Sequence, residues 1–168
     1  MASSYRDSLG VTKEPASPAS TPKTVPRPLA PTAEDRLRAG LPPPIRPGDR
    51  GRKTHGNWSA GGEAQPIASG WDGMAEAAER QLDALDIPVT PVTTTHVETK
   101  LAAHMAENGI PDAAVAINYT SCEGPFGCDT LVPALLPKGS TLTVHGTLPD
   151  GTKTTDIYRG GATPWWKQ

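Results

Sequence analysis

Four residues of the types that hold metals and move protons stand in two short stretches of the 168-residue sequence. His96 and Glu98 are separated by one residue, and Cys122 and Cys128 follow downstream. Residues two apart do not share a helix face, so His96 and Glu98 reach one site only where a helix begins. Imidazole and thiolate are zinc ligands, and three of them leave a fourth tetrahedral position for water, as in a catalytic zinc site. The pattern predicts zinc ligands at His96, Cys122 and Cys128, with Glu98 off the metal and handling protons.

A second interpretation of the first stretch needs no metal. Thr95-His-Val-Glu98 fits the capping box, in which Thr and Glu satisfy free amides at a helix start, and short motifs match often by chance. The chain would then be a non-catalytic interaction module with its cysteines free or disulfide-bonded. Two cysteines in a chain without an export signal favour metal ligands or free thiols. A metal assay would separate the two interpretations.

The first 52 residues differ in composition from the rest. They hold ten prolines and a net charge of +4, whereas residues 53–168 carry −6. Such a stretch buries too little apolar surface to offset its ordering entropy, so residues 1–52 are expected to be a disordered basic linker, dispensable for chemistry. One short helix over Thr32–Ala39 is an exception that the pattern permits. No signal peptide is expected, and no apolar run is long enough to span a bilayer, so synthesis in the cytoplasm and no membrane partner are expected.

Residues 53–168 are expected to form the catalytic domain, with eight elements in this order: a hairpin of 53–58 and 65–71, helices at 73–86 and 95–108, a strand at 113–119, a helix after Cys128, and strands at 140–145 and 153–159. Asn108-Gly109 is typical of a left-handed helix cap. The short link between the last two strands favours an antiparallel pair. This order predicts an α/β sandwich with helices covering a mixed sheet.

Helix, strand and cysteine loop together bring two helix N-termini to one edge of the sheet. His96 comes from one helix, and both cysteines come from the start of the other, where the helix N-terminus favours thiolate over thiol. Asn118 and Ser121, at the adjoining strand end, are candidate base or sugar contacts. Trp58 and Trp71 favour packing, and Trp165 and Trp166 favour an apolar anchor over stacking on nucleotides. His104 and His145 have no partner at ligand spacing and are interpreted as surface or core histidines.

His96-Val-Glu98 followed by the cysteine pair resembles the zinc-dependent nucleobase deaminases, whose signature is H-x-E and then P-C-x-x-C. More closely, 96–109, 120–128 and 135–137 resemble the bacterial DddA-type DNA cytosine deaminase toxins, actinobacterial branch. The similarity extends to Gly56-Asn-Trp58, to Ser69-Gly70-Trp71 and to Pro164-Trp-Trp166. Two departures stand out, because five residues separate the cysteines and Ser121 replaces the usual proline.

The resemblance implies a cytidine deaminase-like three-layer sandwich with a five-stranded mixed sheet behind a disordered tail. It implies Zn²⁺ as cofactor, Glu98 as proton shuttle, and hydrolysis of cytosine to uracil, in single- or double-stranded DNA. Gly70 and Trp71 become further candidate substrate contacts. A monomeric toxin-type effector, delivered or secreted by a non-classical route and countered by an immunity protein, is the implied context. Because the charge of −6 on residues 53–168 disfavours phosphate binding, free nucleoside or RNA remains an alternative substrate.

Overall fold

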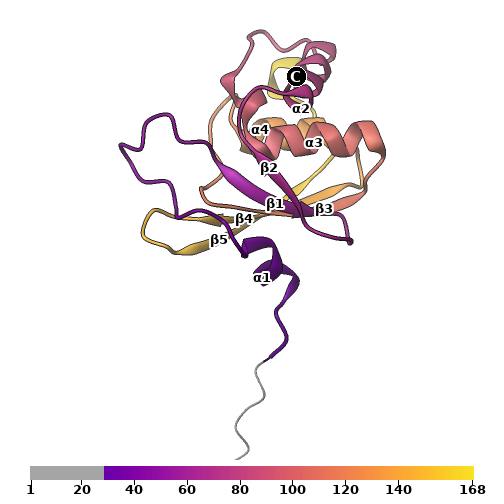
Figure 1. The fold of residues 1–168 in the computed structure, drawn as a ribbon. Helices are drawn as coiled ribbons and strands as arrows, with labels where there is room; N and C mark the ends of the chain where they lie inside the picture. Colours follow the sequence, from indigo (N-terminus) through magenta and orange to yellow (C-terminus); the bar gives the residue numbers. More distant parts are fainter. Residues whose placement is uncertain (1–28) are drawn as a thin grey trace, which may run out of the picture. The chain divides into compact units, whose positions relative to one another are not determined.

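The centre of the protein is a five-stranded sheet in the order β2-β1-β3-β4-β5 (Figure 1). The computed structural model describes residues 29–168, and the compact unit that holds the sheet runs from Pro31 to Gln168. The strands are β1 His55–Ser59, β2 Gln65–Ala68, β3 Asp112–Ile117, β4 Thr141–Thr147 and β5 Lys153–Arg159. β3 and β4 run parallel, and the other neighbours are antiparallel. The mixed five-stranded sheet with an antiparallel last pair is therefore confirmed.

Helices cover both faces of this sheet. Three of them, α2 Gly73–Ala84, α3 Val97–Asn108 and α4 Cys128–Leu135, lie on one face, and the short α1 Ala33–Arg38 lies on the other (Figure 1). A 3-10 turn at Val92–Thr95 precedes α3, and a second one at Trp165–Lys167 follows β5. Gly109 closes α3 with φ 63° and ψ 33°, as its sequence predicts. The result is a three-layer α/β sandwich.

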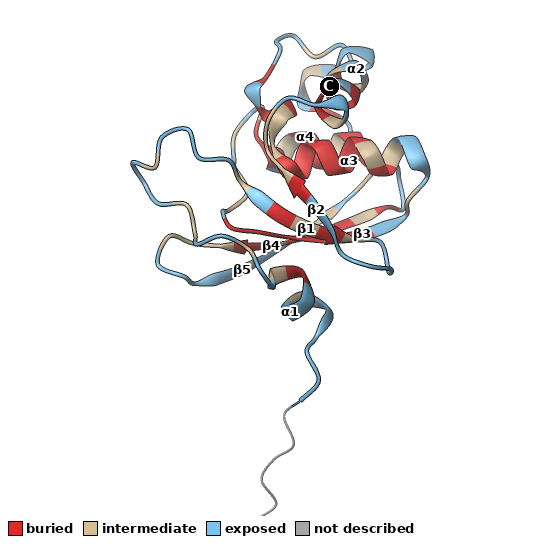
Figure 2. Ribbon diagram, viewed as in Figure 1, coloured by how far each residue is buried: buried red, intermediate tan, exposed pale blue. Residues whose placement is uncertain are grey.

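The core lies between the sheet and the three-helix layer (Figure 2). β4 alternates between buried and half-buried residues, so one row of its side chains faces the helices. Leu101 and Met105 of α3 are four residues apart, share a helix face and are fully buried. α3 is buried along most of its length, which fixes the position of its first turn relative to the sheet.

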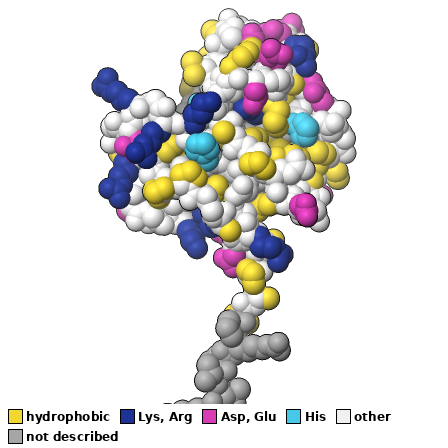
Figure 3. Space-filling model, in the orientation of Figure 1, with side chains coloured by type: hydrophobic (Ala, Val, Ile, Leu, Met, Phe, Trp, Pro, Cys, Tyr) yellow, Lys and Arg dark blue, Asp and Glu magenta, His cyan; other side chains and the backbone are white. Residues whose placement is uncertain are grey.

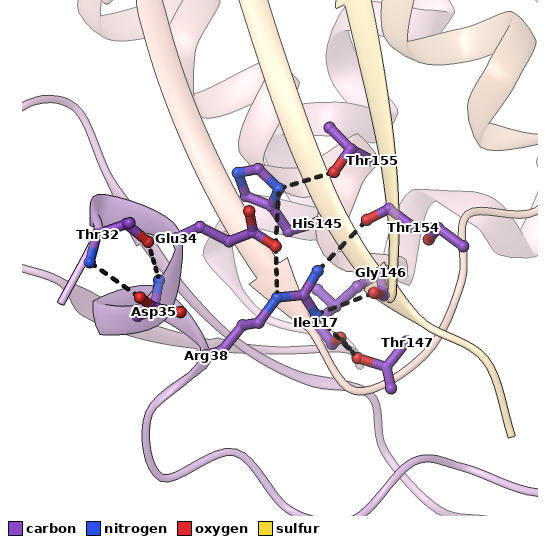
Figure 4. A network of polar contacts seen from close by, with 10 residues as sticks. All are labelled: Thr32, Glu34, Asp35, Arg38, Ile117, His145, Gly146, Thr147, Thr154 and Thr155. Atoms are coloured by element: carbon purple, nitrogen blue, oxygen red, sulfur yellow. Dashed lines mark hydrogen bonds and ion pairs between the residues drawn. The ribbon is translucent and has the colours of Figure 1, made fainter. Parts of the chain in front are cut away.

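α1 forms the third layer through few but specific contacts. A capping box closes its start, with the Asp35 amide donating to Thr32 Oγ1 at 3.1 Å and the Thr32 amide donating to Asp35 Oδ2 at 2.9 Å. Leu37 is buried. Arg38 donates to the Gly146 carbonyl at 3.0 Å and to Thr147 Oγ1 at 3.1 Å, both on β4 (Figure 4). The helix is thus attached to β4 by a side chain that is 11% exposed.

The compact unit begins 22 residues before the boundary expected at residue 53, because residues 31–52 include α1 and the segment that leads into β1. Proline-rich composition predicted disorder there, and one buried leucine and one arginine carry little weight in such an estimate. The part of the expected linker at 1–28 lies outside the described residues. Within residues 29–168, no helix is both long and apolar enough to cross a bilayer.

Candidate metal centre

Two helix starts meet at one edge of the sheet. α3 begins at Val97 with His96 as its N-cap residue, and α4 begins at Cys128 after Gly127. The helix predicted from Thr95 thus starts two residues later. Thr95 does not cap it, since its hydroxyl donates to the Val92 carbonyl at 2.8 Å within the preceding 3-10 turn. The capping-box interpretation of Thr95 to Glu98 is therefore wrong. The side chains of His96 and Glu98 are free to face the site.

Three potential ligands converge at this edge. His96 Nδ1 lies 3.4 Å from Cys122 Sγ and 3.6 Å from Cys128 Sγ, and the two sulfurs are 3.3 Å apart. Zinc–sulfur and zinc–nitrogen bonds of about 2.3 and 2.0 Å in a tetrahedron place donor atoms about 3.4–3.8 Å apart. Both cysteines are free thiols rather than a disulfide. The donor set and its spacing therefore fit a tetrahedral zinc site with one face open.

The protonation of the cluster also suits a cation. The Cys128 amide donates to Cys122 Sγ at 3.2 Å, and the two sulfurs lie 3.3 Å apart. The side-chain contact with Cys128, together with nearby His96, lowers the pKa of Cys122 to about 4. The same contact and burial raise the pKa of Cys128. The Cys122 sulfur likewise raises the pKa of His96. Cys122 thus carries the negative charge of the cluster, and a divalent cation would displace the protons that Cys128 and His96 retain.

Glu98 lies beside the cluster without belonging to it. Its side chain is buried, with Oε1 accepting a 3.0 Å hydrogen bond from Ser121 Oγ and Oε2 3.8 Å from Cys128 Sγ. Burial raises the pKa of this carboxyl, although the Ser121 hydroxyl acts in the opposite direction. Ser121 also faces Tyr158, whose pKa is raised to about 12 by burial. The Ser121 hydroxyl thus orients the Glu98 carboxylate through Oε1, and Oε2 lies toward Cys128.

The wide loop between the cysteines is held from outside. Trp165 Nε1 donates to the Pro125 carbonyl at 2.7 Å, and Thr93 Oγ1 donates to the Phe126 carbonyl at 2.6 Å. The Phe126 ring lies 5.4 Å from that of Trp165 and 6.0 Å from that of Trp166. Five residues thus bulge out while both cysteines stay in place. Trp165 and Trp166 anchor this loop, in agreement with their predicted packing role.

A pocket of about 200 Å³ opens directly on the cluster. Its lining contains His96, Glu98 and Cys122 together with seven other residues: Arg52, Thr54, Ser69, Thr95, Val97, Tyr119 and Thr120. Drug-sized ligands occupy about 300–1,000 Å³, so this hollow suits a single small ring. A larger hollow of about 550 Å³, between α1 and the β1–β2 turn, holds no Cys or His.

The candidate substrate contacts lie at different distances from this pocket. Asn118 does not line it, because the buried Asn118 amide accepts from the His55 amide at 2.8 Å and donates to the Pro43 carbonyl at 3.1 Å. Ser121 faces Glu98 instead. Gly70, with φ +119°, donates its amide to the Thr95 carbonyl at 2.9 Å and so abuts the rim.

Trp71 is 58% exposed, so its predicted packing role is wrong. β2 ends at Ala68, and Trp71 follows in the connection to α2, beyond the strand's alternation. Trp58 is buried as expected, with its ring 5.4 Å from that of His104. His145 is half-buried beside Thr155 and Glu34, in keeping with a non-ligand role.

One pocket residue was missed by reasoning from sequence. Arg52 lines the same hollow as His96 and Glu98, yet it was assigned to a disordered linker. The signal available was the run of basic residues immediately before the first strand, at Arg46, Arg50, Arg52 and Lys53.

Comparison with known families agrees with this architecture. No curated protein matches the chain. The model of the family described as SCP1.201-like deaminase matches residues 25–162, a span that takes in α1, every strand, the three residues of the cluster and Glu98. The chain therefore belongs to the SCP1.201-like deaminase family.

Proposed function

We propose that the protein is a zinc-dependent hydrolytic deaminase that converts cytosine to uracil in DNA. The observation that carries this proposal is the geometry of one edge of the sheet. Three ligand atoms lie within 4.8 Å of one another, and a buried carboxylate that is not among them faces the same pocket. Three protein ligands and an open position are typical of catalytic rather than structural zinc.

His96, Cys122 and Cys128 would hold the ion, which supplies acidified water as the nucleophile. Glu98 accepts the proton of the attacking water and returns protons to the ring N3 and to the leaving amine. Water and cytosine thereby yield uracil and ammonia. Ser121 holds Glu98 Oε1 at 3.0 Å, which leaves the other carboxylate oxygen for proton transfer. The 200 Å³ hollow admits one base at a time, so a base in a polymer would have to leave its stack.

The toxin context is proposed on the similarity to the DddA-type branch. On this proposal the protein acts as a monomeric effector in a competing cell, and an immunity protein protects the producer. Gly70 and Trp71 are kept as rim contacts, since Gly70 abuts Thr95 and Trp71 is exposed beside it. Asn118 instead holds the pocket's surroundings in place.

Replacement of Glu98 by Gln tests the role of the carboxylate. Glutamine keeps the length and the hydrogen bond from Ser121 but cannot shuttle protons, so deamination should fall about 10²–10⁴-fold. One zinc per chain should remain bound, because Glu98 is not a ligand. The matched control is Glu123→Gln, an exposed acid in the cysteine loop, which should keep full activity.

Uracil formation on cytosine-containing oligonucleotides and zinc content by mass spectrometry are the measurements. In bacteria without uracil-DNA glycosylase, wild-type protein should raise C-to-T mutations, and the Glu98→Gln variant should not. Glu98→Gln activity within a few-fold of wild type would show the proposed mechanism to be wrong.

A further inference from the structure

Four exposed basic side chains lie in one eight-residue loop between α1 and β1. The basic loop, residues 46–53, carries Arg46, Arg50, Arg52 and Lys53 against the single acid Asp49, a net charge of +3. Among residues 29–168, none of these four side chains has an ion-pair partner. Figure 3 shows Lys and Arg side chains gathered where this loop projects from the sheet edge.

The rest of the compact unit has the opposite charge. Residues 31–168 contain 12 Lys and Arg and 16 Asp and Glu, which gives −4 in total, so the part outside the basic loop carries −7. Unpaired basic residues concentrated in an otherwise acidic unit leave a local positive field. The loop therefore attracts an anion to one place on an acidic surface.

The segments at both ends of the loop are bound to the sheet at one buried residue, Asn118. Asn118 Nδ2 donates to the Pro43 carbonyl, while Asn118 Oδ1 accepts from the His55 amide, and the Ile45 amide donates to the Asn118 carbonyl at 3.0 Å. Asn118 is the residue that follows β3. Both ends of the 45–55 segment are thus held at one point beside the pocket, which presents the basic side chains in a defined place.

The basic loop also reaches the pocket itself. Arg52 lines the hollow that contains His96 and Glu98. Lys53 Nζ lies 3.4 Å from the position that a Cβ on Gly70 would occupy, and Trp71, the residue after Gly70, is exposed. Guanidinium and ammonium groups together with an exposed aromatic side chain are the components of a surface that tracks a single strand.

We propose that the basic loop binds the phosphodiester backbone of the DNA strand whose cytosine enters the pocket. Arg52 contacts the phosphate next to the target nucleotide, and Arg46 and Arg50 contact phosphates further along the strand. This inference rests on the proposed function and deepens it, because it makes a polymer rather than a free nucleoside the substrate.

Binding is measured by fluorescence anisotropy with full-length Glu98→Gln protein, so that no turnover occurs. The probes are labelled single- and double-stranded DNA and RNA oligonucleotides that carry one cytosine. The test variant adds Arg46→Gln and Arg50→Gln, neither of which lines the pocket, and the control adds Arg80→Gln and Lys138→Gln, which remove the same charge elsewhere.

Loss of two phosphate contacts should reduce the slope of log Kobs against log salt by about 1.4–1.8 and weaken DNA binding roughly ten- to a hundred-fold at 50 mM salt. The control should keep the wild-type slope. In the active protein, the loop change should lower kcat/KM on DNA and leave that on cytidine unchanged.

Equal salt slopes for test and control variants would overturn the proposal, as would equal loss of activity on cytidine and DNA. Binding confined to RNA would overturn the assignment to DNA. A protein that forms no uracil but shows the expected loss of slope would refute the proposed function and leave the basic loop as a DNA-binding element.

Discussion

Lys100 is a buried cation whose removal should destabilise the protein measurably. Its side chain is 1% exposed, and Nζ donates to the Ala68 carbonyl at 2.6 Å, the Gly70 carbonyl at 3.2 Å and Asp72 Oδ2 at 2.6 Å. It thereby joins α3, two residues after Glu98, to the loop that forms the pocket rim. Replacement by Met keeps the length of the stem and removes the donor.

The size of the effect follows from these contacts. Two carbonyls lose bonds to a charged donor, worth about 1.5–3 kcal/mol each, whereas the pair with Asp72, which is 51% exposed, adds at most about 1 kcal/mol. Relief from burying an ammonium, several kcal/mol per ion, offsets much of this loss. We expect a net loss of about 2 kcal/mol, or about 8 °C in Tm for a unit of this size.

The effect should depend on pH in a defined direction. Partial burial raises the pKa of Asp72, but the hydrogen bond from Lys100 lowers it, and the pKa stays below its ordinary 3.8. A depressed carboxyl pKa stabilises the fold above the unfolded pKa, and this stabilisation is lost as pH falls through the folded value. The difference in Tm between wild type and Lys100→Met should therefore become smaller below pH 3.8.

Thermal unfolding followed by circular dichroism, at neutral pH and at pH 3, is the assay. Arg80→Met is the matched control, because the Arg80–Glu107 pair also links α2 to α3 but is 64% and 43% exposed, so its loss should change Tm by less than about 2 °C. Equal Tm values for the two variants would refute the reasoning.

Two further predictions concern α1 and the metal ligands. Leu37→Ala should lower the free energy of unfolding by about 2–3 kcal/mol in urea titrations, since Leu37 is 3% exposed. A chain begun at residue 53 should lose more stability, whereas a chain begun at Pro31 should unfold like the full chain. Equal stability of all three would mean that α1 is not docked. Cys128→Ser should reduce bound zinc, measured by mass spectrometry, well below one ion per chain. Arg159→Ser, a substitution at an exposed position elsewhere, should leave the zinc content unchanged. Retention of one zinc per chain by the cysteine variant would exclude Cys128 as a ligand.

The elements predictable from sequence were those whose signals are local. Periodic apolar residues located α2 and α3, and a short turn between alternating stretches predicted the β4–β5 pair. The site was predictable for the same reason, because His96 and Glu98 stand at a helix start and Cys128 at another. Each required only a helix boundary and the order of elements along the chain.

What could not be predicted depends on contacts between distant residues. Arg38 hydrogen-bonds to Gly146 and Thr147 of β4, which lie 108 and 109 positions further along the chain. Asn118 hydrogen-bonds to Pro43, which lies 75 positions before it. No local pattern announces such partners, and the prolines around them favour disorder. A boundary at residue 53 leaves out α1 and Arg52, although the compact unit begins at Pro31 and Arg52 lines the pocket.

The brace of the cysteine loop has a consequence for the order in which the site can assemble. Trp165, which binds the Pro125 carbonyl, follows it by 40 positions, and β4 and β5 lie between them in sequence. A ribosome therefore releases His96, Cys122 and Cys128 well before it releases the ring that holds their loop. A growing chain that ends near residue 160 carries every ligand, and its cysteine loop has the contact from Thr93 but not yet the one from Trp165. The cysteine loop therefore gains its last support only after β5 has been synthesised.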